Sequence, residues 1–322
     1  MNKKLLTYVV VGGISIVAIV AFLKSPSQVK IGSSTAEPTK AQVPRAEVRR
    51  PQSSALKNPL PQVGAPLHLI EGDLKRRALA GDGSAACRLA LEYQRCVVAE
   101  QRVEHVAEVM AGSDPNEAPR RVALPLDPNG FYVDVAHCAD VNAPPAIEIA
   151  ALWRRAADSG NPAAMTNYAV GNAFSIGNIL DTIDELQVYK QRAGTLAHKA
   201  AMSGDGGALL SLAAAYSPEN QVGPRSFLAQ AVGTDLQQSL TLYKAAYISL
   251  DSSGANGDIG SFVAERIAAL SKRASASQLS DADTASRKMA GEMGKVRYPS
   301  SRAIAYLRLG RTAEPAVTDC GD

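Results

Sequence analysis

The sequence contains few aromatic residues. They make up 5% of its 322 residues, with a single tryptophan, whereas hydrophobic residues make up 46%. A core with so few large rings must be filled by alanine and aliphatic side chains, which is typical of closely packed helices. The chain also lacks a convincing run of alternating apolar and polar residues that would indicate a β-strand. We therefore predict an all-α fold.

Catalytic motifs are also absent. The chain has no Gly-x-Ser-x-Gly and no His-Glu-x-x-His, and it has only four histidines. The glycine-rich stretch Gly204 to Gly207 follows a predicted helix and has no lysine of a phosphate-binding loop, so we interpret it as a turn. We expect no cofactor, no bound metal and no enzymatic activity.

A basic excess is missing from the part of the chain that is predicted to fold. Residues 1–66 hold nine of the 34 Lys and Arg residues but only two of the 31 Asp and Glu residues. The remaining 25 basic and 29 acidic residues leave the body slightly acidic. A nucleic-acid-binding protein would show the opposite balance, so we expect no nucleic-acid partner.

The amino terminus predicts a membrane anchor. An uncharged stretch of 19 residues runs from Leu5 to Leu23, and as a helix it would reach about 29 Å, close to the hydrocarbon thickness of a bilayer. Lys3 and Lys4 place the short amino end in the cytoplasm. We predict a single-pass signal anchor over residues 1–24 in the inner membrane, with the rest in the periplasm or outside the cell. A cleaved signal peptide is the alternative.

The composition then divides the chain further. Residues 25–70 are rich in proline and polar residues and predict a disordered linker. Residues 71–296 predict a helical repeat domain, interrupted by an irregular insert at about 99–143. Residues 297–322 predict a basic carboxyl-terminal helix and a tail.

One small pattern occurs three times in the predicted domain. Small and large apolar residues recur every four positions after a glycine, so they stack on one face of a helix that begins with a turn. The positions are Gly81, Ala85, Leu89 and Tyr93, then Gly160, Ala164 and Tyr168, then Gly204, Ala208, Leu212 and Tyr216. A returning pattern of this kind predicts stacked helical hairpins.

This spacing resembles the Sel-one-like repeat, a relative of the tetratricopeptide repeat. The resemblance implies a helical-hairpin solenoid with two antiparallel helices, A and B, in each repeat. It also implies a scaffold that brings proteins together, often in bacterial envelopes. The copies depart from the family in their spacing, since the glycines lie 79 and 44 residues apart, and Asn172 replaces the last tyrosine of the second copy.

Capping residues and periodicity predict the individual helices. Two capping boxes are expected, at 182–185 and 234–237. The segment 126–135 predicts a small hairpin or a packed loop. The predicted helices cover 74–79, 84–98, 144–157, 161–174, 182–202, 206–216, 234–250, 258–271, 282–293 and 301–309.

Four cysteines in an exported chain predict disulfide bonds. Cys87 and Cys96 lie on one predicted helix, about 13 Å apart along its axis, which is too far to bond. Two pairings remain open. Either Cys96 bonds Cys138 and Cys87 bonds Cys320, or Cys87 bonds Cys138 and Cys96 bonds Cys320.

A metal site is the rival interpretation of these cysteines. Its ligands would be Cys96, His105, His137 and Cys138. The adjacency of His137 and Cys138 is awkward for one tetrahedral ion, and the chain has no Cys-x-x-Cys. We therefore favour disulfide bonds.

Together these features predict a membrane-anchored, exported scaffold that binds a protein or peptide partner in the bacterial cell envelope. The alternatives are an accessory factor of a cell-wall, secretion or pilus machinery and, third, a glycan-cleaving enzyme with two facing carboxylates. A partner would contact the concave face through A-helix side chains that are not used in stacking. The candidates, expected at the surface, are Arg88, Glu92, Asn167 and Asn172.

Overall fold

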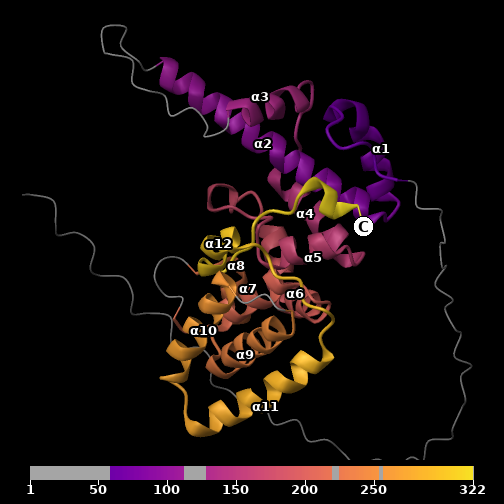
Figure 1. Ribbon diagram of the computed structural model, residues 1–322. Coiled ribbons are helices and arrows are strands. Elements are labelled where there is room, and N and C mark those ends of the chain that lie inside the picture. The colour runs from indigo at the N-terminus through magenta and orange to yellow at the C-terminus, as the bar shows by residue number, and fades with distance from the viewer. Residues whose placement is uncertain (1–58, 112–127, 220–224, 254–256, 322) are drawn as a thin grey trace, which may run out of the picture. The chain divides into compact units, whose positions relative to one another are not determined.

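The computed structural model describes residues 59–111, 128–219, 225–253 and 257–321, and this part of the chain is all-α (Figure 1). The only strand-like feature among these residues is an isolated bridge between Asp205 and Arg297. The α-helices are α1 (Leu67–Leu79), α2 (Gly83–Ala111), α3 (Pro128–His137), α4 (Ala146–Asp158), α5 (Pro162–Ala169), α6 (Ile183–Met202), α7 (Gly206–Tyr216), α8 (Phe227–Val232), α9 (Leu236–Ser253), α10 (Asp258–Ser271), α11 (Ala276–Glu292) and α12 (Ile304–Arg308). Three 3₁₀ turns are η1 (Ile176–Asn178), η2 (Ser301–Ala303) and η3 (Val317–Cys320).

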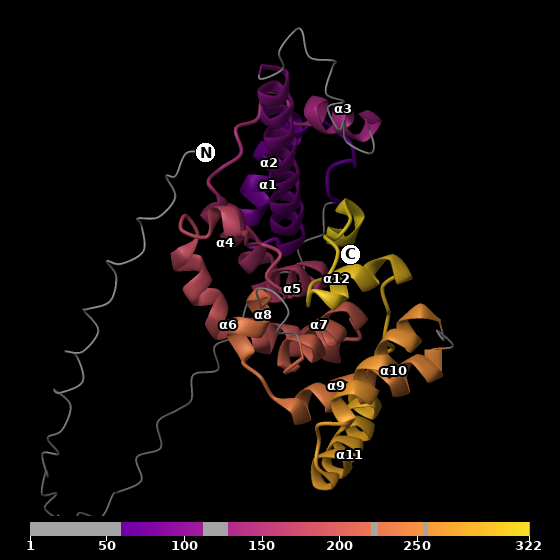
Figure 2. The same cartoon turned by 90° about the vertical axis from the view of Figure 1, so that its left-hand side faces the viewer.

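Consecutive helices are neighbours along most of the body. The contacts run from α1 to α2, from α2 to α4, and then through α5, α6 and α7 to α9, which also packs against α10 and α11. Figures 1 and 2 show α1 to α3 at one end of this compact unit and α9 to α11 at the other. The helix α3 packs beside α2 and stands outside the series.

The three repeated glycines form three matching turns. Gly81, Gly160 and Gly204 have φ angles of +91°, +88° and +92° and follow α1, α4 and α6. In each case the glycine N–H donates to the carbonyl three residues back, and the next N–H donates to the carbonyl five residues back. This is the Schellman arrangement, which favours glycine because a side chain strains the left-handed backbone.

The residue after each glycine begins the next helix. Asp82, Asn161 and Asp205 each accept a hydrogen bond at the side-chain oxygen from the backbone N–H three residues later, at 3.1, 3.0 and 2.9 Å. Each donor is the alanine of the repeated pattern, Ala85, Ala164 or Ala208. One residue thus completes the hydrogen bonds at the end of one helix and caps the start of the next. This determines where α2, α5 and α7 begin.

The remaining positions of the pattern form the core. Leu89, Tyr93, Tyr168 and Leu212 are buried, as are the three alanines, while Tyr216 is half-buried. The largest buried rings of the neighbouring helices are Trp153, Tyr189 and Tyr243. Alanine dominates the remainder of this core, in accordance with the small number of aromatic residues.

Several predicted boundaries were wrong. The expected capping box at Thr182 is absent, because its hydroxyl donates to the carbonyls of Asn178 and Ile179 and its side chain does not cap α6. Asp235, and not Thr234, caps α9. Helix α1 begins at Leu67, inside the predicted linker, and α2 continues to Ala111, well into the predicted insert. Helix α8 was not predicted.

The segment 126–135, predicted as a hairpin or loop, contains most of α3. The segment forms a helix that packs against α2, and this distant contact is not visible in the local sequence. The Arg95 guanidinium binds Asp134 at 2.6 Å, and Cys138, directly after α3, is bonded to Cys96 of α2.

The predicted membrane span and the predicted linker belong to the amino-terminal part of the chain. Among the described residues, no helix is long and apolar enough to span a membrane. The predicted span at 1–24, and most of the predicted linker, lie outside the described residues.

Replacing glycine by alanine should change the free energy of unfolding by different amounts at different positions. Gly160→Ala should cost about 1–2 kcal/mol of unfolding free energy, because a Cβ there meets open space and only backbone strain opposes it. Gly204→Ala should cost more, because its Cβ would also lie 2.5 Å from the Lys295 carbonyl oxygen. Gly72→Ala, inside α1 and in open space, should instead stabilise by about 1 kcal/mol. Chemical denaturation of the three variants checks this order, and equal effects would contradict it.

Candidate binding site

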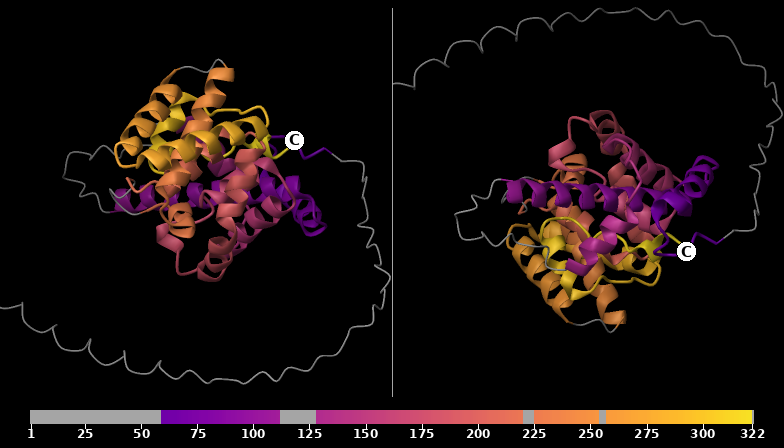
Figure 3. Two further views of the ribbon diagram at one scale, coloured as in Figure 1. Left: turned by 90° about the horizontal axis from the view of Figure 1, so that it is seen from below. Right: turned by 90° about the horizontal axis from the view of Figure 1, so that it is seen from above.

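The carboxyl-terminal segment, residues 293–321, returns along the body after α11. Its helix α12 packs on α7, and its last turn, η3, packs on α5 and α2. The segment therefore passes the starts of the three repeat helices in reverse order. Figure 3 shows the yellow carboxyl end beside the indigo and purple helices in both panels. We call the surface that it covers the α2–α5–α7 face.

Backbone pairing attaches this segment at the start of α7. Arg297 N–H donates to the Gly204 carbonyl at 2.8 Å, and Gly206 N–H donates to the Arg297 carbonyl at 3.0 Å. A Cβ on Gly206 would lie 2.8 Å from the Arg297 oxygen. The glycine-rich stretch at 204–207, predicted to be a turn, is thus a turn that also lets a second backbone approach closely.

Two asparagines of α5 and its flanks hold the same segment further along. Asn172 Nδ2 donates to the Thr312 carbonyl at 3.1 Å, and Asn161 Nδ2 donates to the Cys320 carbonyl at 3.2 Å. Both bonds run from a side-chain amide to a backbone carbonyl, one in the stretch 311–316, which has no regular secondary structure, and one in the 3₁₀ turn η3. They therefore fix the course of the segment with little dependence on its side chains.

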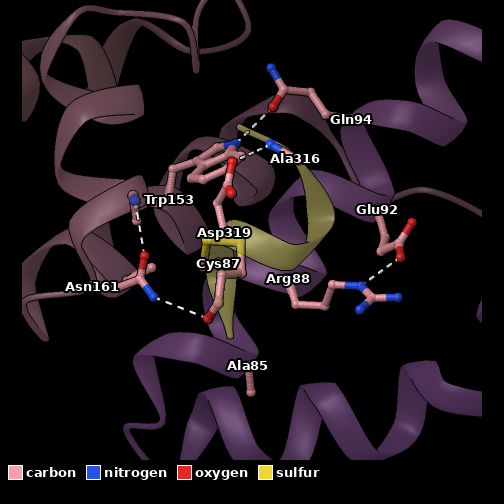
Figure 4. Close-up of a disulfide and its surroundings, with 12 residues drawn as sticks. Ala85, Cys87, Arg88, Glu92, Gln94, Trp153, Asn161, Ala316 and Asp319 are labelled. Carbon is pink, nitrogen blue, oxygen red and sulfur yellow. Dashed lines mark hydrogen bonds and ion pairs between the residues drawn. A yellow bond between two sulfur atoms is a disulfide. The ribbon is translucent and has the colours of Figure 1, made fainter. Parts of the chain in front are cut away.

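A disulfide bond completes the attachment (Figure 4). Cys87 of α2 is bonded to Cys320, with their Cα atoms 5.5 Å apart, and both residues are fully buried. Cys96 is bonded to Cys138, with a Cα separation of 5.4 Å. The structure thus has the first of the two pairings that the sequence left open.

A cavity of about 500 Å³ remains between the carboxyl-terminal segment and the starts of α5 and α7. Pro162, Pro299, Pro315 and Tyr298 supply flat, largely apolar walls. The polar side chains that line it include Thr166, Asn167, Asp205, Arg297, Thr312, Glu314 and Asp319. We call this cavity the α5–α7 pocket.

The pocket has an acidic character. Asp205 accepts from the Thr166 hydroxyl at 2.7 Å and from the backbone of α7, and Asp319 accepts from the Ala316 N–H at 2.7 Å. No ion pair in the described part of the chain neutralises Asp205, Glu314 or Asp319. Although much of Glu314 is exposed, partial desolvation raises the pKa of its carboxyl group.

One polar atom at this pocket has no partner. Asn167 is 1% exposed, and its Oδ1 accepts from Asn172, but its Nδ2 forms no hydrogen bond within the described part of the chain. A buried donor without an acceptor costs about 1–3 kcal/mol, so its retention in a pocket wall requires an explanation.

The residues predicted to contact a partner are mostly not at the surface. Arg88, Glu92 and Asn167 are at most 1% exposed, so their expected exposure was wrong, and Asn172 is half-buried and bound to Thr312. Asn172 is covered by the carboxyl-terminal segment, whereas Arg88 and Glu92 belong to a buried network with His137 of α3. Sequence periodicity does not reveal such a cover.

The buried charges near α3 form one network. The Arg88 Nε donates to Glu92 at 2.6 Å, and the other Glu92 oxygen lies 2.8 Å from His137 Nε2. Burial alone would raise the pKa of Glu92, but the His137 hydrogen bond and the Arg88 charge outweigh it and hold this pKa below its ordinary value. The network therefore helps to dock α3 on α2.

The alternative metal site does not form. Cys96 and Cys138 are bonded to each other, and His105 is exposed. Within the described ranges, no three His, Cys, Asp or Glu side chains gather in a way that could hold a metal ion.

Comparison with known proteins adds no relative. No protein-family model, no curated protein and no solved structure matches the chain. The site must therefore be interpreted from its own geometry.

The Glu92 network predicts a dependence of stability on pH. A carboxyl group whose pKa is lower in the folded state stabilises the fold above its unfolded pKa, and this stability is lost as the pH falls through the folded value. The protein should therefore lose stability below about pH 4.5. Glu92→Gln should cost about 3–5 kcal/mol at pH 7, because it leaves Arg88 buried without its counter-charge, and should flatten the acid limb.

Urea denaturation between pH 7 and pH 3 measures both effects. Glu104→Gln is the matched control, because Glu104 lies exposed on the same helix and should change neither value. An unchanged acid limb in Glu92→Gln would contradict the account.

Proposed function

We propose that this protein is a membrane-anchored, exported helical-repeat scaffold that binds a protein or peptide partner in the bacterial cell envelope. Three findings support the proposal. The repeated pattern resembles the Sel-one-like repeat, and its three copies begin with matching turns and caps. The two disulfide bonds suit an oxidising compartment outside the cytoplasm, where the charge pattern of the amino terminus would place the body. The solenoid and the anchor are parts of this proposal.

The α5–α7 pocket carries the proposal most directly. It combines apolar walls, uncompensated carboxylates and an unpaired buried amide donor, and such convergence of polar groups in a cavity is typical of a binding site. It also lies between two of the repeat helices. The sequence analysis likewise predicts that a partner contacts side chains of the A helices.

A glycan-cleaving enzyme is a second candidate, on one observation. Glu314 has a raised pKa and shares the pocket with Asp205 and Asp319, and glycosidases use a carboxylic acid of raised pKa beside a second carboxylate. Asp205, however, already accepts two hydrogen bonds and caps α7, which favours a structural role for it.

Site-specific crosslinking tests the proposed function. A photoreactive benzoyl-phenylalanine in place of Ala313, an exposed pocket residue, should give a discrete crosslinked partner in cells. The same group at Ala107, exposed on α2 and away from the pocket, should not. Mass spectrometry of the product identifies the partner and the peptide that is joined.

Two outcomes would overturn the scaffold. One is the absence of any product that depends on the Ala313 position. The other is release of glycan fragments from purified cell wall by the full-length chain, with loss of that activity in Glu314→Gln, which would establish the enzyme.

A further inference from the structure

The three asparagines of α5 and its flanks form a set. Asn161 caps the helix, Asn167 lies within it, and Asn172 follows it. The amide groups of Asn161 and Asn172 each donate to a backbone carbonyl of the carboxyl-terminal segment, at Cys320 and Thr312 (Figure 4 shows the first). The amide group of Asn167, placed between them in sequence, has the same donor, but no described residue accepts from it.

The carboxyl-terminal segment thus shows how this face binds a polypeptide. Side-chain amides of the face donate to backbone carbonyls of the segment, one in the irregular stretch 311–316 and one in η3. Asn167 lines the cavity that this segment leaves open, so a group bound in the cavity can supply the acceptor that its Nδ2 lacks among the described residues. A backbone carbonyl is the group that the two neighbouring asparagines already bind.

The charges of the pocket define the side chain that such a segment would carry. Among the described residues that line the pocket, three are carboxylates and one is a cation. They are Asp205, Glu314 and Asp319, and Arg297. Desolvation raises the pKa of Glu314, and an incoming cation would offset that cost because it favours the ionised carboxylate. The proline and tyrosine walls suit the aliphatic stem of a lysine or arginine.

We propose that the α5–α7 pocket binds an extended peptide segment of the partner that carries a basic residue. A backbone carbonyl of this segment accepts from Asn167 Nδ2, and its basic side chain lies among the three carboxylates. The inference rests on the proposed function, because it specifies the chemistry of the partner that the scaffold takes.

Fluorescence anisotropy with defined peptide pools tests the inference. The probes are labelled, end-blocked heptapeptides of mixed sequence whose central residue is fixed as Lys, Arg, Ala or Glu. The full-length chain should bind the Lys and Arg pools roughly tenfold more tightly than the Glu pool. Glu314→Gln should reduce this preference by about threefold or more, whereas Glu292→Gln, exposed and outside the pocket, should leave it unchanged.

The asparagine is tested with a variant that does not threaten the fold. Asn167→Leu keeps about the size of the side chain and removes the unpaired donor; Asn172 Nδ2 loses its bond to Asn167 Oδ1 but keeps its bonds to Thr312. Binding of every pool should weaken by about tenfold, whereas the melting temperature should change little. Ser211→Ala is the matched control. Ser211 occupies the same position after the turn in α7, is buried and also has an unpaired side-chain oxygen, but it does not line the pocket.

The results separate the inference from the function on which it rests. Equal binding of the Lys and Glu pools, or full binding by Asn167→Leu, would overturn the basic-peptide inference. If crosslinking through Ala313 still captured a partner, the scaffold would stand and only its ligand chemistry would be wrong. Absence of that crosslink would contradict the proposed scaffold function itself.

Discussion

The attachment of the carboxyl-terminal segment to the α2–α5–α7 face is the constraint on which the rest of the structure depends. Backbone hydrogen bonds hold it at α7, two asparagine amides hold it along α5, and the Cys87–Cys320 bond holds it at α2. This bond joins residues 233 apart in sequence. A crosslink that closes so long a loop removes much conformational freedom from the unfolded chain, and typical disulfides stabilise by about 2–4 kcal/mol.

This cover accounts for part of an otherwise unfavourable feature of the core. Arg88, Asn167 and Ser211 occupy the same position after their respective glycine turns, and all three are polar, at most 1% exposed and incompletely hydrogen-bonded. On an open repeat surface these positions would meet water. Asn167 borders the pocket that the carboxyl-terminal segment leaves, Arg88 joins the buried network with Glu92 and His137, and Ser211 does neither. The same cover that buries the face thus shapes the site left within it.

The sequence predicted local features well where a local interaction determines them. The helices 206–216 and 258–271 begin and end as predicted, and the three glycines mark real turns, because left-handed backbone and capping act within a few residues. The Schellman hydrogen bonds and the Asp82 and Asp205 caps were missed, although the Asp or Asn that follows each glycine was a usable signal. The hairpin or loop predicted over 126–135 was wrong, because this segment forms a helix in contact with α2, which is distant in sequence.

The sequence did not predict the binding site, because segments that are distant in sequence form it. Its walls come from α5, from α7 and from residues 297–319, and nothing in the periodicity of the repeats places that last segment on their face. Asn172 was expected to bind a partner, and it binds the protein's own Thr312 instead. The sequence predicted a distant contact only through its cysteines. The bond between Cys87 and Cys320 belonged to one of the two pairings that it left open.

Disulfide mapping tests the central claim, that the carboxyl-terminal segment is fixed across the α2–α5–α7 face. Tryptic cleavage places the four cysteines on separate peptides, 78–88, 96–102, 122–154 and 312–322. Mass spectrometry of the unreduced protein, matured outside the cytoplasm, should find 78–88 joined to 312–322 and 96–102 joined to 122–154. A bond between 78–88 and 122–154, or a free thiol on 312–322, would contradict the account.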